Sequence, residues 1–294
     1  RRWRAFPAPV ARGDNASGRR RSGHGVRWHG LLRGLRTFAR THLGMLVTNR
    51  SDRLDALRGL ALVWMTVYHF CFDLNHFGFI RQNFYEDPLW TLQRTAIVSL
   101  FLFTAGVGQA LAVQGGQGWP RFWRRWAQIA GCAALVSLGS WWMFPKSWIS
   151  FGVLHGLAVM LLLARAALAR RWLQGWVPWV VGLALIAAAP LLDAWLAPHA
   201  ATPLAAALDS RWLNGLGVVT HKPVTEDYVP LLPWLGVLLL GVAAGQTLPR
   251  AAVARPVGRL GHGLAALGRW SLSYYMLHQL VLIGALVAWM HGLR

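Results

Sequence analysis

The sequence predicts an all-α integral membrane protein, built as a bundle of about seven transmembrane helices. Two observations predict this fold class. The 294 residues are 55% hydrophobic and only 14% charged, which is too apolar for an ordinary soluble domain. The apolar residues also gather in blocks long enough to cross a bilayer. The net charge of +20 is spread between these blocks instead of forming one patch, so nucleic acid is not an expected partner.

Residues 1–50 differ from the rest of the chain. They are rich in Arg, Gly and Ser and have no sustained apolar period. We therefore expect a basic, disordered cytoplasmic arm, with no cleavable signal peptide, ahead of a transmembrane domain over residues 51–294.

Hydropathy defines the elements of that domain. Seven spans are predicted, near residues 58–77, 91–113, 124–144, 149–168, 174–196, 230–248 and 269–290. No internal period or inverted symmetry stands out, which argues against a transporter built from repeats.

Arginines on alternate connections predict the orientation. The arginine-rich connections carry Arg121, Arg124 and Arg125, then Arg165, Arg170 and Arg171, then Arg250, Arg255 and Arg259. The opposite connections carry only Arg81, Lys146, Arg211 and Lys222. By the positive-inside rule the N-terminus is cytoplasmic, in the inner (cytoplasmic) membrane of a cell.

The first span carries ionisable residues on one face. At about 100° and 1.5 Å per residue, Arg58 and His69 differ by roughly 20° around the helix and lie roughly 16 Å apart along it. Asp73 and His76 follow within two turns. Such residues are costly inside a membrane and indicate a functional site. The alternative is that Arg58 anchors the helix at headgroups and His69 only bonds a neighbouring helix.

Two further groups of polar residues fall at span ends. Arg121, Arg124 and Arg125 alternate with tryptophans in WPRFWRRW, which suits either an aromatic belt with inside charges or a phosphate-binding site. His155, in FGVLHGLA, is expected about two turns below the outer surface, at a depth comparable with His69. Gly106 and Gly108, in the second span, are expected to allow close helix packing.

The last span and the segment before the sixth span add more candidates. Tyr274 and His278 make the last span unusually polar, so it should face the bundle interior. Residues 197–229, which include Asp227, form an outer connection long enough to carry function.

Five ordered motifs resemble a known family. RLDALRGLALVWMTVYH, SLFLFTAGVG, FGVLHGLA, DYVPLLPW and LGRWSLSYYMLHQ are similar to the bacterial branch of the heparan-alpha-glucosaminide N-acetyltransferase catalytic-domain family. The resemblance covers most of residues 52–290. The spacing from Arg58 to His69 is also similar to that in bacterial integral-membrane O-acyltransferases, which suggests a wider transmembrane acyltransferase superfamily.

The resemblance implies a multi-pass enzyme that moves an acyl group, typically acetyl, from cytoplasmic acetyl-CoA to a sugar or glycan hydroxyl or amine on the other side. Arg58 and His69 would be its first-helix pair. Lysosomal members have an essential histidine just after the first helix, where this chain has His76, so the catalytic assignment is split between His69 and His76. Acetyl-CoA is expected as a co-substrate, with no permanently bound cofactor and no metal.

Chemistry assigns the remaining roles. A histidine can act as base or acyl carrier, and Asp73, one turn on, could orient the His69 ring. The predicted site comprises His69, Asp73 and His76 for catalysis, Arg58, Arg121, Arg124 and Arg125 for the coenzyme A phosphates, and His155, Asp227, Tyr274 and His278 along the path between them. Two other readings stay open: an exporter in which Arg58, His69 and Asp73 relay protons, and a structural membrane protein whose polar residues join helices.

Overall fold

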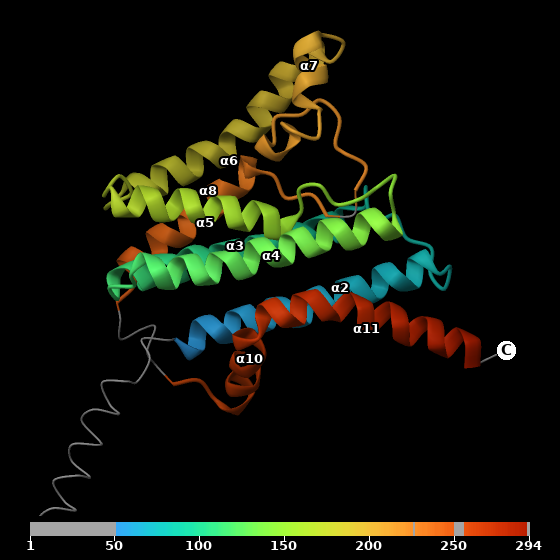
Figure 1. Ribbon diagram of the computed structural model, residues 1–294, viewed down its shortest axis with the longest axis horizontal. Coiled ribbons are helices and arrows are strands. Elements are labelled where there is room, and N and C mark those ends of the chain that lie inside the picture. The colour runs from blue at the N-terminus through green and yellow to red at the C-terminus, as the bar shows by residue number, and fades with distance from the viewer. Residues whose placement is uncertain (1–50, 226, 250–255, 293–294) are drawn as a thin grey trace, which may run out of the picture. The chain divides into compact units, whose positions relative to one another are not determined.

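The computed structural model describes residues 51–225, 227–249 and 256–292, and every regular element in these ranges is a helix (Figure 1). The all-α class is therefore confirmed. The arm predicted over residues 1–50 lies outside the described residues.

Each predicted span coincides with one long helix. These helices are α2 (Asp52–His76), α3 (Pro88–Gln114), α4 (Trp119–Met143), α5 (Val153–Ala169), α6 (Val177–Leu196), α8 (Leu231–Thr247) and α11 (Ser271–Gly292). Within the described ranges, three helical stretches are long and apolar enough to cross a membrane: α3, residues 177–199 including α6, and α11. Helices α5 and α8 are shorter but also apolar.

Local sequence explains where the first two long helices begin. The Ser51 hydroxyl accepts a hydrogen bond from the Leu54 N–H at 3.2 Å, and acidic residues follow in the first turn of α2. The Asp87 carboxylate accepts the Leu89 N–H at 2.8 Å, and Pro88 occupies the first helical position of α3. Both starts follow common capping patterns and lie a few residues before the spans that hydropathy predicted from 58 and 91.

The connections contain short helices that the sequence did not predict. Residues 197–229 include η1 (Ala197–His199), α7 (Pro203–Leu208) and η2 (Asn214–Leu216), and the connection before the last span includes α10 (Arg259–Arg269). Helix α10 has the glycine-rich sequence RLGHGLAALGR, whose intrinsic helix propensity is low. Its packing against α2 supplies the missing stabilisation: a Cβ added to Gly268 would lie 1.8 Å from the Asp55 carbonyl oxygen.

Small residues let α3 and α8 pack closely. A Cβ on Gly106 would lie 2.0 Å from the Leu238 carbonyl oxygen, and one on Gly241 would lie 2.1 Å from the Phe103 carbonyl oxygen. The close approach predicted at Gly106 is confirmed. Gly108 instead makes room for the Arg58 guanidinium.

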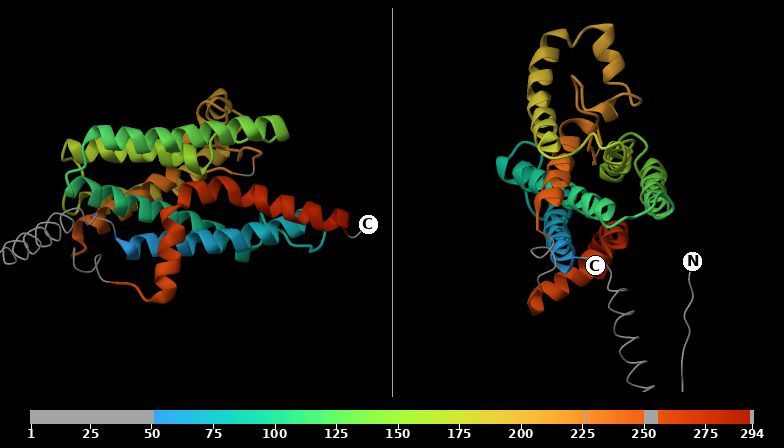
Figure 2. Two further views of the ribbon diagram at one scale, coloured as in Figure 1. Left: turned by 60° about the horizontal axis from the view of Figure 1, so that its bottom comes forward. Right: turned by 90° about the vertical axis from the view of Figure 1, so that its left-hand side faces the viewer.

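Helix α2 packs against α3, α10 and α11, and α2 and α11 run side by side in the views of Figures 1 and 2. A core of buried side chains lies on the α3 side of α2: Leu62, Met65, Tyr68, Phe84 and Ile97. The polar residues of the C-terminal half of α2 meet α11 instead, as described below.

Large apolar side chains remain exposed on the outer surfaces of several helices. Leu138 on α4, Leu191 on α6 and Leu280 on α11 are each at least 61% exposed. A soluble monomer rarely leaves so much apolar surface in water, whereas hydrocarbon covers it at no cost. The surface therefore agrees with a membrane protein.

Candidate active site between helices α2 and α11

Two side-chain pairs join α2 to α11. The rings of His69 and His278 meet edge to face, with centroids 5.1 Å apart. One turn further along α2, Asp73 Oδ1 accepts a hydrogen bond from the Gln279 amide at 2.7 Å. Adjacent residues of α11 thus contact residues one turn apart on α2.

The catalytic role predicted for His69 and Asp73 stays a prediction. The (i, i+4) spacing does bring both side chains to one face of α2, but the structure records no hydrogen bond between them. The Gln279 amide takes one oxygen of Asp73, and the His69 ring lies against His278. Each of these two side chains therefore contacts a residue of α11.

His278 lies at the centre of this cluster, whereas the sequence predicted only that it lines the path to the site. Its Nδ1 lies 2.7 Å from the Tyr275 carbonyl oxygen. Because a carbonyl can only accept, Nδ1 carries the proton, and in the neutral ring Nε2 keeps a free lone pair. His278 is 8% exposed, and its Nε2 is buried with no hydrogen-bond partner among the residues that the structure describes. His278 Nε2 can therefore act as a base, because no donor among the described residues occupies its lone pair.

Two more buried oxygens in the cluster have no hydrogen-bond partner within the described ranges. They are Asp73 Oδ2 and Gln279 Oε1. Together with His278 Nε2 they offer three acceptors, and a buried acceptor without a donor costs on the order of 1–3 kcal/mol. A ligand with several O–H or N–H donors would satisfy these three acceptors.

Tyr274 joins the same interface. Its hydroxyl lies 2.6 Å from Thr66 Oγ1 on α2, and its ring stacks on His278 with centroids 6.0 Å apart and an interplanar angle of 8°. Because Thr66 Oγ1 donates to the Leu62 carbonyl, Tyr274 is the donor in this bond. The predicted position of Tyr274 beside the site agrees with this geometry.

Asp227 lies where three motifs meet. Its Oδ2 accepts hydrogen bonds from the Val153 N–H at 2.9 Å and from the Tyr275 hydroxyl at 3.1 Å. Burial raises the pKa of Asp227, and these two bonds oppose that effect. Asp227 therefore caps α5 and fixes α11, three residues before His278.

His155 takes a different position from the one predicted. Helix α5 begins at Val153, so His155 lies in its first turn and not two turns inside. Its Nδ1 accepts the Gly152 N–H at 3.2 Å, and its Nε2 lies 3.0 Å from Ser137 Oγ. Hydropathy missed this start because Asp227, which is distant in sequence, sets it. A cavity role for His155 stays a prediction.

Two other candidates of the first helix lie nearer its two ends. His76 is exposed at the C-terminal end of α2, where a cation is favourable. Arg58 donates to Asp55 Oδ1 at 3.0 Å and to the Thr104 carbonyl at 3.1 Å, and it packs on Gly108. These contacts join α2 to α3, and the catalytic and donor-binding roles stay predictions.

The arginine cluster of α4 is exposed. Arg121, Arg124 and Arg125 lie on its first two turns, beside the stacked rings of Trp119 and Trp123. The geometry suits both predicted roles, the aromatic belt and phosphate binding.

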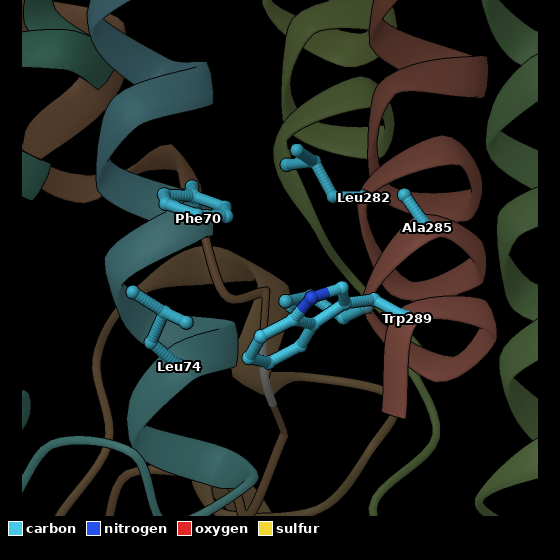
Figure 3. Close-up of a pocket in the computed structure, with 6 residues that line it drawn as sticks. Phe70, Leu74, Leu282, Ala285 and Trp289 are labelled. Atoms are coloured by element: carbon cyan, nitrogen blue, oxygen red, sulfur yellow. The ribbon is translucent and has the colours of Figure 1, made fainter. Parts of the chain in front are cut away.

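An apolar groove opens beside the polar pairs. Phe70 and Leu74 of α2 face α11 across it, and its volume is about 330 Å³ (Figure 3). The α11 side is formed by Leu282, Ala285, Leu286 and Trp289. The groove begins one turn beyond Gln279, so the polar cluster has hydrocarbon surface on one side.

The helices and the buried histidine–carboxylate cluster define a helical membrane protein with a candidate catalytic site inside its bundle. The model of the family described as heparan-alpha-glucosaminide N-acetyltransferase, catalytic, matches residues 50–280, and the chain belongs to this family. Membership indicates an acyltransferase-type membrane enzyme. Searches of curated proteins and of solved structures gave no significant match.

Proposed function

We propose that the protein transfers an acetyl group from cytoplasmic acetyl-CoA to a hydroxyl or amine of a sugar on the extracytoplasmic side. The observation that carries this proposal is the buried, unpartnered Nε2 of His278, held against His69. Acyl transfer needs a base of this kind, and the neighbouring free acceptors suit a donor-rich sugar. Family membership supports the reaction class.

The groups of the cluster can carry the proton that the reaction moves. His278 Nε2 accepts the proton of the sugar hydroxyl or amine. The oxygen or nitrogen of that sugar group attacks the thioester carbonyl carbon at the same time. A C–O or C–N bond forms, the C–S bond breaks, and the proton passes from His278 to the departing thiolate. Asp73, which bonds the next residue of α11, Gln279, would stabilise the imidazolium that exists between these steps. His69 contacts the same ring and is the alternative base or acyl carrier.

The proposed topology has seven spans and a cytoplasmic N-terminus. The arginine-rich connections support this orientation. It places Arg58 at the cytoplasmic edge and His69 roughly 16 Å deeper along α2, toward the outer side. The acyl-bearing arm of acetyl-CoA would enter from the cytoplasm and the sugar from the opposite side.

The test is acetyl transfer by purified protein in lipid nanodiscs, with acetyl-CoA as donor and glucosamine as a probe acceptor. Coenzyme A release is measured as free thiol. His278→Gln should lower the rate by about 10²–10⁴-fold, as expected for loss of a general base. His291→Gln is the matched control, because His291 lies on the same helix, is exposed and also bonds a backbone carbonyl, at 2.8 Å.

Three outcomes would change the proposal. Full transfer by folded His278→Gln, with none by His69→Gln, would return the base to His69 as the sequence predicted. Loss of transfer only in His76→Gln would assign the base to His76, at the end of α2. Absence of acetyl-CoA binding by the unmodified protein would contradict the enzyme and favour a proton-coupled exporter.

A further inference from the structure

A buried arginine lies at the other end of the bundle, far along the chain from the α2–α11 pairs. Arg165, on the last turns of α5, is 5% exposed. Its Nη2 donates to the Gln117 carbonyl oxygen, and its guanidinium carbon lies 5.1 Å from the Trp119 ring centroid and 5.6 Å from that of Phe122. The side chain therefore points at the connection between α3 and α4 and at the first turn of α4.

Arg165 has hydrogen-bond donors that nothing satisfies. Its Nε and Nη1 are buried and have no partner in the described part of the chain, and the ion pairs found there do not include it. Burying an unpaired charge costs several kcal/mol, and two aromatic rings offset only part of that. The free Nε–H and Nη1–H lie on either side of the bonded Nη2, so they offer two separate charged donors to the oxygens of an anion.

The start of α4 adds a second feature of an anion site. Helix α4 begins at Trp119, and its N-cap residue Gly118 has no side chain to bond the N–H groups of Trp119 and Arg121. Pro120 has no N–H, and the Phe122 N–H donates to the Gly118 carbonyl oxygen at 3.3 Å. The N-terminus of a 25-residue helix carries a partial positive charge and binds phosphates well. Arg121, exposed on the same turn, adds a full charge.

We propose that Arg165 and the first turn of α4 form a binding site for a phosphate group. On the proposed function, on which this assignment of the ligand rests, the phosphate is one of those of the acyl donor. Arg165 supplies two charged N–H donors, the N–H groups of Trp119 and Arg121 supply further donors, and the exposed cluster of Arg121, Arg124 and Arg125 attracts the anion. From the sequence only a topological role was predicted for Arg165, because its burial depends on contacts with residues about 45 positions earlier.

Entry to the site requires one ring to move. Trp119 covers Arg165 and is itself 39% exposed, so it can rotate outward without breaking the core. Phe122 is 4% exposed and stays as the inner wall.

The experiment compares Arg165→Met with Arg170→Met. Arg170 is a matched control, because it also ends α5 and lies 5.3 Å over a tryptophan ring, that of Trp172, but is exposed. Binding of labelled acetyl-CoA is measured in phosphatidylcholine nanodiscs, with inorganic pyrophosphate as competitor. Acetyl transfer is measured with acetyl-CoA and with S-acetylpantetheine, which has no phosphate.

Arg165→Met should weaken acetyl-CoA and pyrophosphate binding by about 10- to 100-fold, as expected for loss of hydrogen bonds to a charged group. Transfer from S-acetylpantetheine should not change, and Arg170→Met should behave as the unmodified protein. Arg165→Lys, which keeps the charge but loses the planar guanidinium with its spread of N–H donors, should fall between them. It also serves as the second variant if Arg165→Met does not fold.

Equal binding by Arg165→Met and the unmodified protein would overturn the inference, as would equal losses with both acyl donors. Pyrophosphate binding that needs Arg165, without any acetyl-CoA binding, would contradict the proposed function and keep the phosphate site. In nanodiscs that contain phosphatidylglycerol, competition between lipid and acetyl-CoA only when Arg165 is present would keep the site and assign it to a lipid headgroup.

Discussion

The hydroxyl of Tyr275 donates a hydrogen bond to Asp227 Oδ2 across 3.1 Å, and the same oxygen caps α5 through Val153. One carboxylate therefore fixes α11 to α5 and to the segment before α8. The Tyr275 carbonyl in turn accepts the Nδ1 proton of His278. The side chain and the backbone of Tyr275 thus connect the cap of α5 to the ring proposed as the base.

The first prediction concerns this connection. Tyr275→Phe should lower the free energy of unfolding by about 1 kcal/mol, the net value of one hydrogen bond, and should lower acetyl transfer by loosening α11 beneath His278. Tyr274→Phe is the control, because it removes a bond to Thr66 without touching a carboxylate. Thermal unfolding in detergent and the transfer assay measure both variants. Identical effects of the two changes on transfer would argue against a special role for Asp227.

The second prediction separates packing from chemistry at Asp73 and Gln279. Asp73→Asn removes the charge, and Gln279→Glu places two carboxylates together, so each single change should reduce transfer at least tenfold. The double variant restores an amide–carboxylate pair with its members exchanged. It should regain thermal stability but not transfer, because the charge has left α2. If transfer returns as well, the pair only joins the helices.

These residues also show which features of the fold and of the candidate site could be predicted from the sequence. Hydropathy located the seven long helices, and the helical period correctly placed His69 and Asp73 on one face of α2. It could not identify Gln279 or His278 as their partners, because the contacts span more than 200 residues of sequence. The only available signal was the polar run in α11. Helix α10 was missed for a related reason, since its stability comes from packing on α2 and not from its own residues.

The third prediction tests close packing of α3 and α8. Gly106→Leu should destabilise the protein by more than about 2 kcal/mol, because the added side chain must displace the Leu238 backbone from a site with no space. Gly139→Ala, on α4, is the control, since nothing lies within 4 Å of a Cβ there. It should be neutral or slightly stabilising, because alanine favours helix. Similar melting temperatures for both variants would contradict the packing found here.

The fourth prediction is a pH dependence in the segment before α8. Burial acts to raise the pKa of Asp209, but hydrogen bonds from Thr220 and His221 outweigh it and lower the pKa to about 2. A carboxylate with a lowered pKa stabilises the fold above its ordinary value of 3.8 and loses that contribution as the pH falls toward 2. Limited proteolysis within residues 209–221 should therefore accelerate between pH 4 and about 2. Asp209→Asn should cleave rapidly even at neutral pH; protection equal to that of the unmodified protein would contradict the role of this carboxylate.

The last prediction tests the orientation proposed for the whole bundle. A reporter that is active only outside the cytoplasm should be active when fused after Lys222 and inactive when fused after Arg171. The physical reason is the arginine asymmetry: cytoplasmic connections retain Lys and Arg because moving them across the membrane is costly. A fusion after Lys146, between α4 and α5, serves as a second outside point and tests whether those helices cross separately. Activity at Arg171 with silence at Lys222 would invert the chain and place His278 near the cytoplasmic side. Silence at both Lys146 and Arg171 would mean that α4 and α5 do not span, and the proposed topology of seven spans would fail.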